Sequence, residues 1–262
     1  MRKKILRLIS LVGGLAIGFA VIAADENYEV DFYKSGLLND QGVGIDRDVI
    51  AEIQKRTGFP FKLSEKPRAR IWHELKSGAL AMTVSGIPTP EREQFAWFIP
   101  YLTQRNMAIV LKKKAAQYRS LEEFVADRDA LVGVVRGFVH GKEFDTALST
   151  LRAQGRVYEA TSVDALFRLL SLDHRIDLVF ALPVFYQSQL KDLKMFEKVQ
   201  INDWETQAAP IPHCLVLSRK LVSERDVEAM RNTIDEMKTD GTLKAILARY
   251  LSEADVEATL RF

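Results

Sequence analysis

Short apolar runs alternate with helical periodicities along most of the chain. In the first half, the apolar runs predict strands at residues 28–33, 59–63, 80–84 and 107–111. Between the first two runs, Ile45, Val49, Ile50 and Ile53 share one face of a helix that is expected to end near Gly58. This alternation of strand and helix is typical of an α/β fold with a largely parallel sheet.

The pattern starts afresh after the basic run at residues 112–114. Here the apolar runs predict strands at residues 131–135, 157–160, 176–182 and 213–217. Ser120 followed by Glu123 forms a capping box, which predicts a helix start. The chain therefore contains two βαβ systems of similar size, and its last segment carries helical periodicity.

These two systems predict two lobes, each a mostly parallel sheet flanked by helices, joined by a two-strand hinge. We expect residues 24–111 to form the first part of lobe 1, residues 112–209 to form lobe 2, and residues 210–262 to return to lobe 1. The chain then crosses between the lobes near residues 107–113 and 208–218. Because ligands in open α/β sheets bind outside the carboxyl ends of strands, the lobes should face each other across a cleft.

The first residues predict export. Four basic residues within the first seven precede an apolar run at residues 8–22, and small residues allow cleavage after Ala23. An uncleaved membrane anchor is the alternative, but glycines interrupt the run and it is shorter than the ~20 residues that a spanning helix needs. We interpret residues 1–23 as a cleavable signal peptide and expect a periplasmic protein.

Composition narrows the class of protein. The 37 Lys+Arg and 35 Asp+Glu give a formal charge of +2, but removal of the four basic residues of the signal leaves 33 against 35. A nearly neutral mature chain has no general electrostatic reason to bind nucleic acid. Cys214 is the single cysteine of the sequence, which excludes an intrachain disulfide.

The stretch TVSGIPTPEREQFAWFIPYL, residues 83–102, holds a contradiction. Thr89 is a good helix N-cap and Pro90 suits the first helical position, so a helix is predicted to begin there. Arg92 follows at once, although a cation near the positive N-terminal end of a helix costs about 0.3–1 kcal/mol. The position lies after a predicted strand, at the expected cleft, and suggests a site for an anion.

Three segments carry a resemblance: GIDRDVIAEIQKRTG, KPRARIWHELKSGALAMTVSGIPTPEREQFAWFIPY and DEMKTDGTLKAILARYL. Together and in this order they resemble the family 3 extracellular solute-binding proteins of ABC transporters. The likeness covers nearly all of the chain after the signal. It implies a type 2 periplasmic-binding-protein fold, in which two lobes close on a small solute and deliver it to a membrane permease.

The resemblance also implies a role for Arg92. In the family, the arginine of the Thr-x-x-Arg motif grips the carboxylate of the ligand, and a guanidinium group can donate two parallel hydrogen bonds to such a group. The alternative is a surface ion pair of Arg92 with Glu91 or Glu93, which would stabilise little. We favour the ligand contact.

Four other residues are candidates for ligand binding. Ser85 occupies a position where the family commonly has a hydroxyl near the carboxylate, and local backbone capping is its alternative. Tyr33 lies where the family stacks an aromatic ring on its ligand, although a core or rim tyrosine fits equally. Arg70 belongs to a Pro-x-x-Arg pattern and would start a helix at the cleft, unless it is a plain surface arginine. Phe138 stands in lobe 2 where amino-acid binders have Ser or Thr.

Several positions depart from the amino-acid binders of the family. Ala81 replaces an acidic residue, and Ile87 stands where many members have a hydroxyl. Leu182 occupies the position that commonly carries an aspartate for the ammonium group of the ligand. Because an ammonium without a carboxylate partner is penalised in an apolar pocket, a carboxylate with an apolar or aromatic part fits better than an ordinary α-amino acid.

Other chemistry finds little support. The four histidines have no metal-ligand spacing, and there is no nucleophile elbow, phosphate loop or dinucleotide motif. His213 and Cys214 are adjacent on a predicted strand and point to opposite faces, so we interpret both as structural. We therefore expect no metal, no cofactor and no nucleic-acid partner.

The expected partners are a small solute and an inner-membrane ABC permease, and a monomer is expected. An exported enzyme that resembles the cyclohexadienyl dehydratases is an alternative, with Glu143 and Asp164 as acids near the cleft. A sensory module that presents its bound solute to a receptor is a third possibility. We favour a binding protein over an enzyme.

Overall fold

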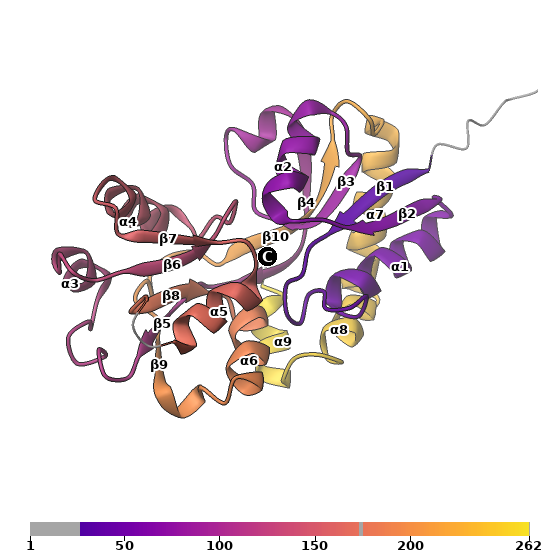
Figure 1. Cartoon of the computed structure of the whole chain (residues 1–262). Coiled ribbons are helices and arrows are strands. Elements are labelled where there is room, and N and C mark those ends of the chain that lie inside the picture. Colours follow the sequence, from indigo (N-terminus) through magenta and orange to yellow (C-terminus); the bar gives the residue numbers. More distant parts are fainter. Residues whose placement is uncertain (1–26, 173–174, 262) are drawn as a thin grey trace, which may run out of the picture.

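The structure is a computed structural model that describes residues 27–172 and 175–261. It has two lobes, each built on a five-stranded sheet flanked by helices (Figure 1). The predicted signal peptide lies outside the described residues.

Lobe 1 has the strand order β2-β1-β3-β10-β4. Its strands are β1 (Tyr28–Phe32), β2 (Phe61–Glu65), β3 (Met82–Gly86), β4 (Ala96–Gln104) and β10 (Ile211–Ser218). β1, β2 and β3 are parallel, and β10 is antiparallel to both of its neighbours. The helices of this part are α1 (Ile45–Thr57), α2 (Arg68–Ser77), α7 (Glu224–Thr239), α8 (Thr242–Leu247) and α9 (Glu253–Thr259).

Lobe 2 has the order β7-β6-β8-β5-β9. Its strands are β5 (Met107–Leu111), β6 (Val132–Val135), β7 (Val157–Ala160), β8 (Leu178–Ala181) and β9 (Val199–Asn202). Its helices are α3 (Leu121–Ala126), α4 (Lys142–Ala153), α5 (Val163–Ser171), α6 (Pro183–Asp192) and the short η2 (Phe196–Lys198). The predicted capping box is present, since the Glu123 amide donates to Ser120 Oγ at 3.3 Å.

The sequence pattern placed β5 in the wrong lobe. β5 pairs with β8 and β9 of the second sheet, with Ile109 opposite Val179 and Ile201. The first crossing therefore lies at residues 105–106, between β4 and β5, and not after residue 111. β5 in the second sheet and β10 in the first are each antiparallel to both of their neighbours. Both sheets are therefore mixed, whereas mostly parallel sheets were expected. β10, the strand of the second crossing, begins at Ile211 in the first sheet.

The helix predicted at Thr89 is also wrong. Thr89 Oγ1 does accept a hydrogen bond from the Arg92 amide at 3.2 Å, but only the 3₁₀ turn η1 (Arg92–Gln94) follows before β4 begins. Pro100 in the middle of β4 argues against a strand, because proline cannot donate to a sheet ladder. β4 is an edge strand, with a register shift in β10 opposite Pro100, and an edge tolerates proline.

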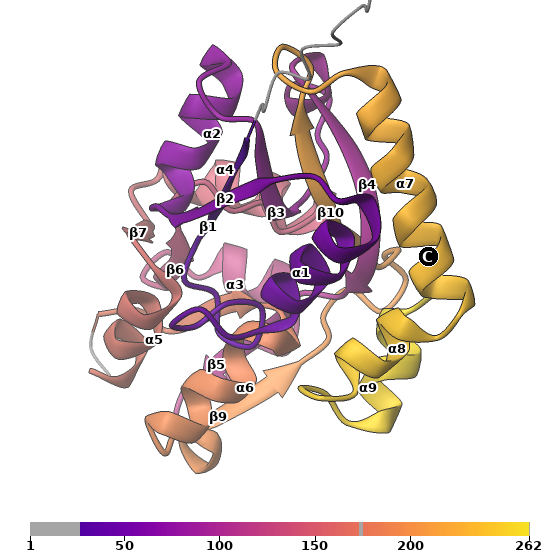
Figure 2. The same cartoon turned by 90° about the vertical axis from the view of Figure 1, so that its right-hand side faces the viewer.

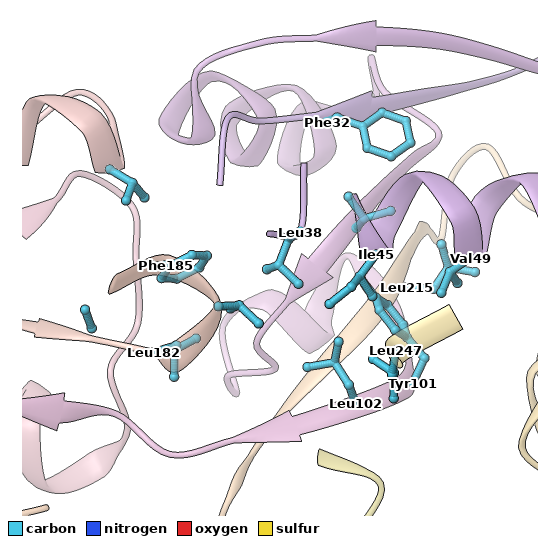
Figure 3. Packing of buried hydrophobic residues seen from close by; sticks show 14 of the residues in the cluster. Phe32, Leu38, Ile45, Val49, Tyr101, Leu102, Leu182, Phe185, Leu215 and Leu247 are labelled. Atoms are coloured by element: carbon cyan, nitrogen blue, oxygen red, sulfur yellow. The ribbon is translucent and has the colours of Figure 1, made fainter. Parts of the chain in front are cut away.

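The hydrophobic core is continuous across the interface between the two lobes. Figure 3 shows Leu38 between Phe185 of α6 and Ile45 of α1, and all three side chains are buried. Figure 2 shows α7, α8 and α9 running down one side of the molecule. Within residues 27–172 and 175–261, no helix combines the length and apolar character that a membrane crossing requires.

Candidate functional site

A cavity lies between the lobes, and the space between its lining residues, including the part open to solvent, is about 350 Å³. Four of the five candidate residues line it: Tyr33, Ser85, Arg92 and Phe138. They come from the ends of β1 and β3, from η1 and from the loop after β6, all at carboxyl ends of strands or just beyond. The fold therefore brings these four side chains together, while Arg70 lies elsewhere.

The Arg92 guanidinium bridges the two lobes. Nη1 donates to the carbonyl of Ile87 in lobe 1 and Nη2 to the carbonyl of Gly137 in lobe 2, both at 2.9 Å. Its Cζ lies 3.7 Å from the ring centroid of Trp72. Burial, with Arg68 nearby, lowers the pKa of Arg92 to about 9, which still leaves a cation at neutral pH. A single 3₁₀ turn carries almost no macrodipole, so the helix-end argument does not apply.

A second arginine, Arg68, was missed by the sequence analysis. It is 5% exposed, and its Nη atoms donate to the carbonyls of Val84 at 3.2 Å and Ser85 at 3.0 Å. Its Cζ lies 4.3 Å from the Tyr33 ring centroid and 4.7 Å from that of Trp72. Arg68 therefore lines the cavity between two aromatic rings, in contact with the end of β3.

Helical spacing could have identified Arg68. Together with Ile71, Trp72 and Leu75 it follows the i, i+3, i+4, i+7 spacing of one helix face, and all four are buried. Arg70 is on the other face of α2, where its side chain is 66% exposed and pairs with Glu74 at 2.7 Å. Arg70 lies in the first turn of α2, as expected, but its side chain does not line the cavity.

Ser85 presents an unusual hydrogen-bond arrangement. It is buried in a left-handed backbone conformation, φ +49°, at the end of β3. Its hydroxyl donates to Asp46 Oδ1 at 2.9 Å, and the Tyr101 hydroxyl donates to the same oxygen at 2.5 Å. While Asp46 is ionised, the Ser85 hydroxyl donates its proton to Asp46 and can only accept hydrogen bonds from a ligand. It could donate to a ligand only if Asp46 no longer accepted its proton.

Asp46 predicts a pH-dependent stability. Burial raises the pKa of its carboxyl to about 7, against about 3.9 in an unfolded chain. Between these values the folded protein binds a proton that the unfolded chain does not. The free energy of unfolding is therefore expected to fall as the pH rises from about 4 to about 7, by roughly 4 kcal/mol, and to level off above. Denaturant titrations across this range should show the slope, and Asp46→Asn should remove it. A variant that keeps the wild-type slope would contradict this assignment.

Two buried histidines complete the polar part of the cavity. His213 of β10 is 1% exposed, and neither ring nitrogen has a hydrogen-bond partner. Burial and the nearby Arg68 lower the pKa of His213 to about 3, so the ring is neutral and carries one N–H donor. His140 Nδ1 also lacks a hydrogen bond, and its ring lines the same cavity. The structural role expected for His213 does not account for these unpartnered atoms.

Lobe 2 supplies an apolar wall. The apolar residues that line the cavity from this side are Phe138, Val139, Phe180, Leu182 and Phe185. The Phe138 ring lies edge-on to Tyr33 at 5.6 Å and 5.4 Å from Phe185, between centroids. Leu182, where an aspartate was considered for an ammonium group, is 2% exposed and begins α6.

Acidic side chains are placed away from the cavity. Asp164 pairs with Lys34 at 2.5 Å, and Glu143 lies behind the hinge in a separate pocket. Within the described part of the chain, no group of three potential metal ligands occurs. No carboxyl group of the described residues lines the cavity.

The lobes touch in a closed arrangement. The Leu37 amide of lobe 1 donates to the carbonyl of Val184 in lobe 2 at 3.0 Å. The ion pair of Lys34 with Asp164 joins the lobes at the mouth of the cleft. With the Arg92 bond to lobe 2, these contacts enclose the cavity from both sides.

Comparison with known proteins agrees with this geometry. An ancestral arginine-binding protein bound to arginine has 21% identity and a TM-score of 0.71, over 86% of this chain and 98% of that chain. AbpA from Streptococcus pneumoniae bound to L-arginine has 18% identity and a TM-score of 0.67, over 90% and 97%. A histidine kinase sensor domain similar to periplasmic binding proteins has 14% identity and a TM-score of 0.70, over 87% and 96%. At these identities the structures show a shared fold.

No curated protein is similar enough in sequence to count as a relative. The model of one family, the bacterial extracellular solute-binding proteins of family 3, matches residues 21–253, which is most of the chain. The matched region contains both lobes, the cavity and all of its lining residues. The chain therefore belongs to the bacterial extracellular solute-binding proteins of family 3.

Proposed function

We propose that this protein is the exported solute-binding component of an ABC importer, and that it captures a small carboxylate-bearing solute between its lobes. The loaded, closed form then presents the solute to an inner-membrane permease. Family membership supports solute binding, and the predicted signal peptide supports export to the periplasm. Because Arg92 contacts both lobes, a ligand bound to it would favour the closed arrangement of the lobes.

One observation carries this proposal. Arg92 is a partly buried cation at the lobe interface, and its guanidinium group donates to two neutral carbonyls. The surface-pair alternative named Glu91 or Glu93 as its partner, and of these Glu91 pairs with Lys76 at 2.6 Å. Because a buried charge without a counterion is costly, a ligand carboxylate is the natural partner for this guanidinium group.

A thermal-shift screen tests the proposal. The mature protein is heated with small carboxylates, amines and neutral sugars in separate wells. Ligands that bind only the folded state stabilise it by about 2.7 kcal/mol at a hundred times their Kd. We expect the melting temperature to rise with some carboxylates and with none of the amines or sugars. Stabilisation by uncharged or cationic solutes alone would contradict the proposal.

The Lys34–Asp164 pair provides a separate test of the clamp. Asp164→Asn removes the charge at the mouth of the cleft without touching the cavity. We expect faster ligand dissociation and an affinity lower by about two- to fivefold, since a partly exposed ion pair contributes less than about 1 kcal/mol. Stopped-flow measurement of the dissociation rate checks this, with Glu257→Gln as control, since it breaks an exposed ion pair with Lys244 outside the cavity. Equal dissociation rates in Asp164→Asn and the wild type would argue against the latch.

A further inference from the structure

The cavity holds two guanidinium groups, and neither has an acidic partner. Arg68 and Arg92 both line it and both lie against Trp72. Within the described residues, the hydrogen bonds of both go only to carbonyl or hydroxyl oxygens. Burying two like charges side by side is unfavourable, since each also disfavours the charged form of the other. One ligand carboxylate would compensate only one of them.

A third buried arginine shows what a structural guanidinium looks like in this protein. Arg156 is 5% exposed and makes four hydrogen bonds of 2.7–3.0 Å, three of them to the carbonyls of Phe124, Val125 and Ala130. Arg68 makes three contacts from two nitrogens, at 3.0–3.4 Å, and Arg92 makes two. A guanidinium group has five N–H donors, so both cavity arginines retain donors that Arg156 has used.

The cavity contains further donors, and no carboxyl group of residues 27–172 and 175–261 lines it. His213 is fully buried with both ring nitrogens unpartnered, and its neutral ring has one N–H to donate. The charge of Asp46 acts on Arg68, and the charges of Asp145 and Glu91 act on Arg92, but none of these three carboxyl groups bonds to either arginine or lines the cavity. The Asp46 carboxyl lies behind Ser85 and Tyr101. The opposite wall is apolar, and Leu182 in this wall offers no partner for an ammonium group.

From this arrangement we infer that the solute is a dianion without an ammonium group: two acidic groups at one end face Arg92 and Arg68, and an apolar body packs against Phe138 and Phe185. This inference rests on the proposed function, because it assigns the solute class to the same cavity. His213 donates to the acidic group held by Arg68. An α-amino acid would bring its ammonium toward two cations and an apolar wall, and is disfavoured.

A matched series of probes tests the inference. 3-Phenylpropanoate, L-phenylalanine and benzylmalonate share one skeleton and carry hydrogen, ammonium or a second carboxylate on the same carbon. 4-Methylpentanoate, L-leucine and isobutylmalonate repeat the series with a smaller body. In at least one series, calorimetric titration should show the malonate binding about ten- to a hundredfold tighter than the monocarboxylate, as one charged hydrogen-bonded contact gives. The amino acid should bind weakest.

Two arginines on the same helix provide matched variants. Arg68→Gln and Arg70→Gln each remove one positive charge from α2, but only Arg68 lines the cavity. Arg68→Gln should reduce the malonate preference to about onefold, while Arg70→Gln should keep it. Arg68→Lys retains the charge, and it should keep part of the preference if Arg68→Gln folds poorly.

The outcomes separate this inference from the proposed function. If, in both series, the monocarboxylate binds as tightly as its malonate, the inference of a dianionic solute is wrong, while the proposed binding of a carboxylate still stands. Tightest binding of an amino acid overturns the inference in the same way. Failure of both malonates to bind at millimolar concentration also overturns it. If no carboxylate binds, either among these probes or in the thermal-shift screen, the proposed function itself is overturned.

Discussion

Replacing Arg92 by alanine is expected to lower the affinity for the bound carboxylate by about thirtyfold to several thousandfold. The guanidinium group contacts the backbone of both lobes and would hold the ligand carboxylate between them. Deleting one partner of a buried charged pair costs about 2–5 kcal/mol. Arg92→Lys should recover only part of the affinity, because an ammonium keeps the charge without the planar fork. Calorimetric titration with the tightest malonate measures both variants.

Stability without ligand provides the control for Arg92→Ala. The change removes two hydrogen bonds and the contact with Trp72, but it also removes a partly buried cation beside Arg68. These effects offset each other, so the ligand-free melting temperature should shift by no more than about 2–4 °C, equivalent to roughly 1 kcal/mol. Unchanged affinity together with a large loss of stability would identify Arg92 as a structural residue.

Leu182→Asp is expected to reverse the solute preference. The new carboxylate would stand in the apolar wall, opposite the two arginines, and could pair with the ammonium group of an α-amino acid. Malonate affinity should fall by about a hundredfold or more, because like charges would face each other in a buried site. L-Phenylalanine or L-leucine should gain affinity by about tenfold or more through a new charged contact.

Leu182→Asp is expected to lower the ligand-free stability, because Leu182 is a buried core residue, and helix capping offsets only part of this loss. Leu182 is the N-cap residue of α6 and makes no side-chain cap, and aspartate is among the preferred residues there. Leu182→Asn keeps the shape and the capping ability without the charge, and it should weaken all probes without reversing their order. The same titrations check both variants. If Leu182→Asp preserves the wild-type order of affinities, the apolar wall does not govern selection against the ammonium group.

Periodicity predicted the two-lobe α/β fold because buried strands and amphipathic helices leave separate signatures. It failed where tertiary pairing decides the outcome. β5 is apolar throughout and fits either sheet by pattern, so its pairing with β8 and β9 could not be predicted locally. β4 contains Pro100, which is acceptable only because the strand lies at an edge.

The candidate site shows the same division. Arg92, Ser85, Tyr33 and Phe138 follow strand ends, and the topology gathers such ends at one cleft. Arg68 was overlooked in favour of Arg70, although its helical spacing with Ile71 and Leu75 already placed it on the buried face.

His213 could not have been identified from the sequence. It lies on a hinge strand, and its sequence neighbours do not distinguish a core histidine from one facing a cavity. Only the shift in register between β10 and β4 and the position of lobe 2 place its ring at the site. The bond of Ser85 to Asp46 likewise depends on α1, β3 and β4 meeting in space.

The proposed ligand is a small organic acid that occupies the space between Arg92 and the apolar wall of lobe 2. Mass spectrometry of the small molecules released when protein purified from its native periplasm is denatured tests this most directly. We expect a solute with two acidic groups and no amine, present in wild-type protein and lost from Arg92→Ala. Release of an α-amino acid, an amine or a neutral sugar from the wild type would contradict it.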